Sequence, residues 1–177
     1  MNSLYRNIGI FGVSGTGKTH LSLQMAQRLK FHNHKLIVLN HTSNEKSYRS
    51  IDNQLTLSEF SEYSDRSTHR LPANWTGQVV AKQTEFDAFL SICTNQVRKS
   101  VIILDDCGGK FDGKMSDIQV EFLYSPKNNE YNVLYQMHTL NQPRARQARR
   151  YPESRPTRRR AQSRYPCLAA RSRRRAG

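Results

Sequence analysis

The sequence of 177 residues predicts an α/β fold, in which a mainly parallel β-sheet carries helices on both faces. The main observation is that short apolar runs of strand length alternate with segments whose apolar residues recur at helical spacing. In addition, the first apolar run ends in a glycine-rich turn that leads straight into a helical segment. No run approaches the roughly 20 apolar residues that cross a bilayer, so we expect no membrane span.

The elements of the first half follow from the order of apolar and polar residues. Residues 8–11 form a short apolar strand, and the apolar residues of 18–31 fall on one face of an amphipathic helix. A second buried strand is expected at 35–40, which is rich in Leu, Ile and Val. Residues 41–78 are polar and rich in Ser, Asn and Asp, so we expect loops there with one short helix or strand.

The second half continues the alternation of helices and strands. Residues 85–97 carry a helical stripe of apolar side chains, and the Val-Ile-Ile-Leu run at 101–104 is the strongest strand in the chain. A helix at 118–124 should stop near Pro126, because proline cannot continue a helix. The last strand is expected at 131–136.

Charge divides the chain into two parts, 1–142 and 143–177. The net charge is +14, but residues 1–142 hold 15 basic and 13 acidic residues, whereas residues 143–177 hold 13 arginines and one glutamate. We expect the first part to be the folded domain. The second part should be disordered, because it has too little apolar surface to offset the entropy of the chain.

Two interpretations of the arginine-rich segment stay open. In the first it is a basic arm that holds phosphate backbones. In the second it lies outside the native reading frame, because residue usage changes abruptly at about Pro143. All nine lysines and all twelve asparagines precede that point, and arginine, alanine and proline dominate after it.

Residues 12–19 fit the phosphate-binding pattern G-x-x-x-x-G-K-[ST] at every fixed position. Its glycines let backbone N–H groups point inward as an anion-binding nest, and the following helix adds the positive end of its dipole. Lys18 should reach the β- and γ-phosphates, and the Thr19 hydroxyl should be a ligand of Mg²⁺. The motif predicts a site for ATP or a close relative. Its residues are Gly12, Val13, Ser14, Gly15, Thr16, Gly17, Lys18 and Thr19.

Asp105 and Asp106 directly follow the strand at 101–104, in the manner of a Walker B element. In a parallel sheet the carboxyl ends of the strands face one crevice, so a carboxylate here should lie near the metal. We expect Asp105 to hold Mg²⁺, directly or through water, and Asp106 to orient or deprotonate the attacking water. The alternative is an acidic start of a loop with no chemistry.

Gln136 ends the last expected strand, and His138 follows two residues later on the same face. A polar side chain at this place can sense the γ-phosphate or position water. The alternative is a polar strand end that faces solvent. We favour Gln136 over His138, which completes a predicted catalytic set of Lys18, Asp106 and Gln136.

The segments 12–19, 102–106 and 131–136 together resemble the core of a P-loop ATPase in which an extra strand separates the Walker A and Walker B strands. Within that branch, residues 5–142 resemble the FtsK/HerA superfamily, especially phage genome-packaging and zonula-occludens-toxin-like ATPases. The resemblance implies a homo-oligomeric ring that couples ATP hydrolysis to DNA movement, with an arginine finger from the neighbouring subunit. Asp106 departs from the glutamate that this family usually carries there.

Motifs and resemblance together predict an ATPase of DNA translocation or viral genome packaging. A small P-loop kinase and a nucleotide-dependent loader or binding module are the alternatives, although residues 1–142 have few arginines and no compact arginine-rich lid. Three cysteines without paired spacing favour a reducing compartment, and the N-terminus has no secretory signal. We therefore expect a cytoplasmic location, which for a viral chain means the host cytoplasm or the virion.

Overall fold

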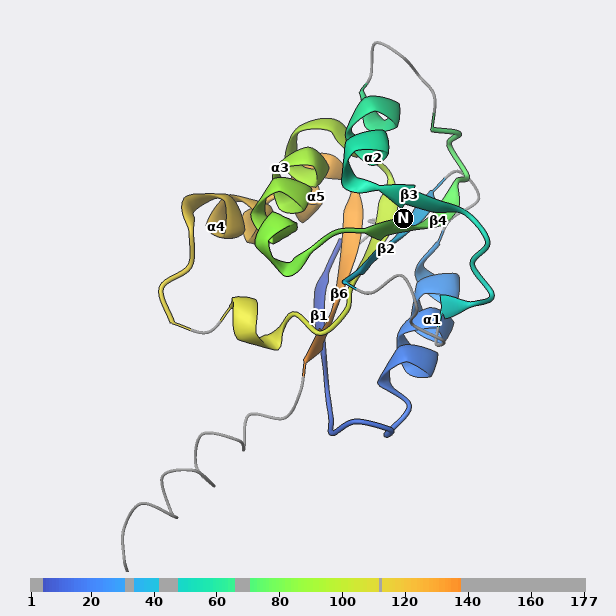
Figure 1. The fold of residues 1–177 in the computed structure, drawn as a ribbon, viewed down its shortest axis with the longest axis vertical. Coiled ribbons are helices and arrows are strands. Elements are labelled where there is room, and N and C mark those ends of the chain that lie inside the picture. The colour runs from blue at the N-terminus through green and yellow to red at the C-terminus, as the bar shows by residue number, and fades with distance from the viewer. Residues whose placement is uncertain (1–4, 31–33, 42–47, 66–70, 112, 138–177) are drawn as a thin grey trace, which may run out of the picture. The chain divides into compact units, whose positions relative to one another are not determined.

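The computed structural model describes residues 5–30, 34–41, 48–65, 71–111 and 113–137. They form a six-stranded sheet with the order β1-β6-β5-β2-β4-β3, in which every neighbouring pair of strands is parallel (Figure 1). The strands are β1 (Asn7–Phe11), β2 (Lys35–Asn40), β3 (Gln54–Thr56), β4 (Thr76–Val80), β5 (Ser100–Leu104) and β6 (Tyr131–Met137). The expectations for His138 and for residues 143–177 lie outside the described residues.

Helices cover both faces of the sheet, which confirms the predicted fold class (Figure 1). One face carries α1 (Lys18–Leu29), which packs against β1, β5 and β6. The opposite face carries α2 (Leu57–Ser64), α3 (Phe86–Gln96), α4 (Asp117–Tyr124) and the short α5 (Pro126–Asn129). Two 3-10 turns, η2 (Gln83–Glu85) and η3 (Gly108–Lys110), precede α3 and follow β5. Within the described ranges, no helix has the length and apolar character needed to cross a bilayer.

The sheet separates the core into two apolar clusters. Successive side chains of a strand point to opposite faces, so Ile37 and Ile102 join the cluster under α2, α3 and α4, whereas Val38 and Ile103 join the cluster under α1. β5 is buried along its whole length. A strand that is covered on both faces has no polar face, which explains the uninterrupted apolar run in the sequence.

Residues 41–78 contain more regular structure than the sequence predicted. Two strands, β3 and β4, and the helix α2 lie where we expected loops with one short element. α2 begins with a capping box, in which Thr56 and Glu59 each accept the backbone N–H of the other. β4 escaped prediction because its central residue, Gln78, is polar and yet buried, so the strand lacks a continuous apolar run.

β6 lies between β1 and β5, as the resemblance implied. Backbone hydrogen bonds continue past the strand ends on both sides of it. Gly12 N donates to the Met137 carbonyl at 3.3 Å, and Cys107 N donates to the Gln136 carbonyl at 3.0 Å. The carboxyl ends of β1, β6 and β5 are therefore fixed side by side.

Candidate functional site

The glycine-rich loop joins the end of β1 to the start of α1. Gly15 (φ 79°) and Gly17 (φ 82°) take the left-handed conformation, which a residue with a Cβ adopts only at an energetic cost. Gly17 is also the N-cap of α1 and offers no side-chain acceptor to the first N–H groups of the helix. The loop therefore has the backbone conformation and the helix start that bind anions in proteins.

Two side chains of the loop bond back to its carbonyl oxygens. Lys18 Nζ donates to the carbonyls of Gly12 at 2.9 Å and of Val13 at 3.0 Å. Thr16 Oγ1 donates to the same Val13 carbonyl at 2.8 Å. The Lys18 ammonium is thus held against the loop, where it can exchange a carbonyl acceptor for a phosphate oxygen.

A pocket of about 620 Å³ opens between this loop and the carboxyl ends of β5 and β6. A volume of this size is within the usual range of small-molecule sites. From the predicted binding loop, Ser14, Gly15, Gly17, Lys18 and Thr19 line the pocket. Gly12, Val13 and Thr16 shape the loop without lining the pocket.

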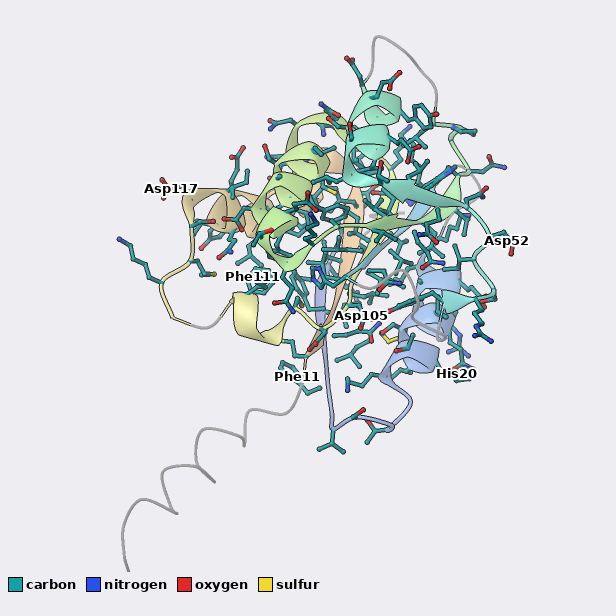
Figure 2. The ribbon with its side chains drawn as sticks, in the orientation of Figure 1. Phe11, His20, Asp52, Asp105, Phe111 and Asp117 are labelled. Atoms are coloured by element: carbon teal, nitrogen blue, oxygen red, sulfur yellow. The ribbon has the colours of Figure 1, made fainter. Side chains whose placement is uncertain are left out.

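Three predicted residues outside the loop, Asp105, Asp106 and Gln136, also line this pocket, so the structure brings them together with Lys18 and Thr19. Asp105 directly follows β5, and its backbone N–H donates to the Leu39 carbonyl at 3.3 Å. In Figure 2 Asp105 lies between the strand ends and α1. Asp106 is exposed and has a φ of 44°, a left-handed conformation that aspartate adopts more readily than most residues.

Gln136 does not face solvent, which excludes the solvent-facing alternative for this strand end. Its side chain is buried, with an exposed fraction of 1%. Gln136 Oε1 accepts a hydrogen bond from the Thr19 hydroxyl at 3.3 Å, and Nε2 donates to the Tyr48 hydroxyl at 2.9 Å. The side chain is therefore fixed at the floor of the pocket, in contact with the predicted Mg²⁺ ligand of α1.

Tyr48 is the main residue of the site that sequence reasoning missed. It is fully buried, and burial raises the pKa of its phenol, as does the negative charge of Asp105. The hydroxyl therefore keeps its proton at neutral pH. Nothing in the sequence marks Tyr48, because it lies in the polar stretch 41–78, where we expected loops.

Three residues that line the pocket were not predicted: His20, Leu23 and Ser50. His20 and Leu23 follow Thr19 on α1 and are one helical turn apart, so a helical projection from the loop motif could have found them. Ser50 belongs to the same unmarked segment as Tyr48.

The residues of the pocket fit a nucleotide with Mg²⁺. The open left-handed glycines leave room for phosphate oxygens, because no atom lies within 4 Å of the place where a Cβ would be. Thr19 and Asp105 offer a hydroxyl and a carboxylate, which are hard oxygen donors of the kind that Mg²⁺ prefers. Among the described residues, no group of three or more His, Cys, Asp or Glu side chains could hold a metal ion.

The glycine-rich loop at the end of β1, the parallel sheet and its flanking helices define the fold of a P-loop NTPase. Comparison with solved structures agrees. The chain is similar to the genome packaging NTPase B204 from Sulfolobus turreted icosahedral virus 2, in its complex with ATP-gammaS. The TM-score is 0.57 at 16% identity, over 79% of this chain and 67% of that one.

Two further structures of that NTPase give comparable values. The complex with AMP matches with a TM-score of 0.56 at 15% identity, over 79% of this chain and 68% of that one. The complex with AMPPCP matches with a TM-score of 0.53 at 16% identity, over 79% of this chain and 67% of that one. Neither a family model nor a curated protein sequence matches the chain. At these identities, the likeness establishes the fold.

Proposed function

We propose that the protein binds ATP with Mg²⁺ and hydrolyses it. One observation carries this proposal: a single pocket joins the glycine-rich loop to Asp105, Asp106 and Gln136. The loop by itself would serve any phosphate binder. The polar groups that face it from β5 and β6 are what a hydrolytic reaction adds, namely a ligand for the cation and groups that can handle water.

Each residue has a role in this proposal. The backbone N–H groups of the loop and the Lys18 ammonium bind phosphate oxygens. Thr19 and Asp105 hold Mg²⁺, which supplies neutralising charge to the phosphates. Asp106 orients the attacking water or takes its proton, and Gln136 positions that water or contacts the γ-phosphate.

We further propose that hydrolysis drives DNA movement, with viral genome packaging as the setting. The fold shared with a viral genome-packaging NTPase and the resemblance to translocating ATPases support this step. The proposal includes a homo-oligomeric ring. No arginine of the described residues lines the pocket, which fits a site completed by an arginine from a neighbouring subunit. The host cytoplasm or the virion is the location that this setting implies.

Turnover with and without DNA separates this function from its alternatives. We expect the purified full chain to hydrolyse ATP in the presence of Mg²⁺ and to do so faster when double-stranded DNA is added. Transfer of the γ-phosphate to a nucleoside monophosphate would instead identify a kinase. Tight nucleotide binding with negligible hydrolysis and no response to DNA would identify a loader or binding module.

Lys18→Ala tests the nucleotide site directly. The change removes a cation from the phosphates, and loss of charged hydrogen bonds at two phosphates weakens binding by about 100-fold. Binding of a fluorescent ATP analogue measures the effect. Lys127→Ala is the matched control, because Lys127 is an exposed lysine on α5 that does not line the pocket. Tight ATP binding by Lys18→Ala would overturn the site assignment.

A further inference from the structure

A chain of hydrogen bonds at the floor of the pocket includes Tyr48, to which the proposed function gives no role. Gln136 is its centre, between the Thr19 hydroxyl (3.3 Å) and the Tyr48 hydroxyl (2.9 Å). The Asp105 carboxylate is also a neighbour of this phenol, because its negative charge helps to raise the pKa of Tyr48. The four side chains come from α1, β6, the segment that precedes β3, and the end of β5.

The direction of each bond has a chemical consequence. Thr19 gives its one hydroxyl proton to Gln136 Oε1, which leaves the lone pairs of Oγ1 free for a cation. The Tyr48 oxygen accepts from Gln136 Nε2, so its own proton is available to Asp105. Asp105 then keeps its remaining lone pairs for the same cation. One set of connected side chains thus orients both proposed Mg²⁺ ligands, Thr19 and Asp105.

Tyr48 is itself rigidly supported. Its carbonyl accepts hydrogen bonds from Gln78 Nε2 at 3.1 Å and from Ile51 N at 2.9 Å. Gln78 Nε2 also donates to the Ile51 carbonyl at 2.9 Å, so a buried side chain of β4 ties residues 48–51 to the sheet. The Tyr48 ring packs in the apolar cluster under α1. The hydroxyl therefore has one place in the site and does not depend on a bound ligand for it.

We propose that Tyr48 is a positioning residue, whose hydroxyl fixes the orientation of the Gln136 amide and of the Asp105 carboxylate and so sets the affinity of the site for Mg²⁺. This inference rests on the proposed function of the pocket and goes beyond it. It means that a residue outside the sequence motifs determines how tightly the site binds Mg²⁺. Residues that orient metal ligands in this way commonly change metal affinity or activity by 10- to 100-fold when they are lost.

Tyr48→Phe isolates the hydroxyl, because phenylalanine keeps the ring that packs under α1. Tyr131→Phe is the matched control: Tyr131 is also fully buried, and its hydroxyl donates to the Phe122 carbonyl, away from the pocket. The first measurement is binding of a fluorescent ATP analogue to the full chain as Mg²⁺ is titrated, and it does not require turnover. The second is steady-state hydrolysis.

For Tyr48→Phe we expect the Mg²⁺ concentration for half-maximal nucleotide binding to rise about tenfold. Nucleotide binding in EDTA should change less than twofold, because the loop is untouched. At saturating Mg²⁺ we expect kcat to fall with little change in KM, because the misplaced Gln136 acts on the water and not on substrate binding. Tyr131→Phe should leave all three quantities at wild-type values.

A double variant tests whether the effect runs through Gln136. In a Gln136→Leu background Tyr48→Phe should raise the half-maximal Mg²⁺ concentration less than in the wild type, because only the part of the effect that acts on Asp105 is left. The single variant Gln136→Leu also provides the test if Tyr48→Phe does not fold, since it must itself raise the half-maximal Mg²⁺ concentration several-fold. Fully additive effects, or Gln136→Leu with wild-type Mg²⁺ dependence, would contradict the inference.

The failures of the two proposals are distinguishable. If the wild-type chain binds Mg²⁺–ATP and hydrolyses it, while Tyr48→Phe matches Tyr131→Phe in every measurement, the role of Tyr48 is wrong and the proposed function stands. If the wild-type chain does not bind ATP with or without Mg²⁺, the proposed function fails, and the inference about Tyr48 fails with it.

Discussion

At the scale of single residues, the backbone of Asp106 is the feature that most needs a functional reason. Lys99, Asp106 and Glu130 are the non-glycine residues with positive φ in the described ranges. Lys99 and Glu130 precede β5 and β6 at the amino ends of the strands, whereas Asp106 lies at the pocket. A left-handed conformation at such residues costs on the order of 1 kcal/mol. At Asp106 this conformation reverses the chain directly after Asp105, so that Cys107 N reaches the Gln136 carbonyl.

Glycine substitution separates the conformational cost from the chemistry. Asp106→Gly and Lys99→Gly should each raise the free energy of unfolding by about 0.5 kcal/mol, because relief of the left-handed strain exceeds the added freedom of the unfolded chain. Urea unfolding measures this gain. Only Asp106→Gly should reduce ATP turnover, by at least about 100-fold, as expected for loss of an acid–base group.

Lys99→Gly is the matched control, since it removes only a 4.0 Å surface ion pair with Glu130, and such pairs contribute little. Wild-type turnover in Asp106→Gly would show that the carboxylate does not act on water. Destabilisation of both variants would show that the positive φ angles carry no strain.

At the scale of elements, the sequence predicted those strands and helices whose burial leaves a simple pattern. β5 is buried on both faces and reads as an unbroken apolar run, and α3 shows its apolar stripe. β4 also lies inside the sheet, beside β2, but its central residue is the buried and polar Gln78, so its sequence shows no unbroken apolar run. The partners that satisfy Gln78 come from residues 40, 48 and 51, and pairings over such separations cannot be read from local sequence.

The same distinction applies to the candidate site. Residues that belong to a motif, such as Lys18 or Asp105, could be placed because the motif fixes both their type and their context. Tyr48 reaches the site from outside any motif, through the hydrogen bonds of Gln78 that seat its backbone. Its place in the site follows from the fold alone, in which Gln78 of β4 holds the backbone of Tyr48 and the Tyr48 hydroxyl meets Gln136 of β6.

Gln78→Leu tests whether this buried polar group holds the segment in place. Leucine has a similar size but cannot donate to the carbonyls of Tyr48 and Ile51, so the free energy of unfolding should fall by about 1–3 kcal/mol. Urea unfolding gives the value. Gln54→Leu on β3 is the control, because Gln54 is exposed and its replacement should change stability by less than about 0.5 kcal/mol. Equal stability of the two variants would mean that the hydrogen bonds of Gln78 contribute nothing to the fold.

At the scale of the whole molecule, charge and chemistry are divided between different parts of the chain. Residues 1–142 contain the described residues that line the pocket and are almost neutral, with 15 basic and 13 acidic residues. Residues 143–177 contain 13 arginines and one acid. DNA binding and DNA translocation can therefore depend on different parts of the chain. Arginines attract the phosphate backbone by charge alone, whether or not they belong to the ATPase domain. Binding of the full chain to DNA would be weak support for a translocase.

A variant with six arginines replaced by glutamine separates DNA binding from DNA-stimulated ATP hydrolysis. The replaced residues are those at 158–160 and 173–175. We expect the DNA affinity of the full chain to fall, and the slope of log K against log salt concentration to become shallower by about 0.9 for each lost phosphate contact. Fluorescence anisotropy with a labelled duplex, measured over a salt series, gives both quantities. At saturating DNA, stimulation of ATP hydrolysis should persist, because the proposed motor lies in residues 1–142. Loss of stimulation at saturation would instead assign the arginine-rich segment to the working protein and would contradict the interpretation that it lies outside the native reading frame.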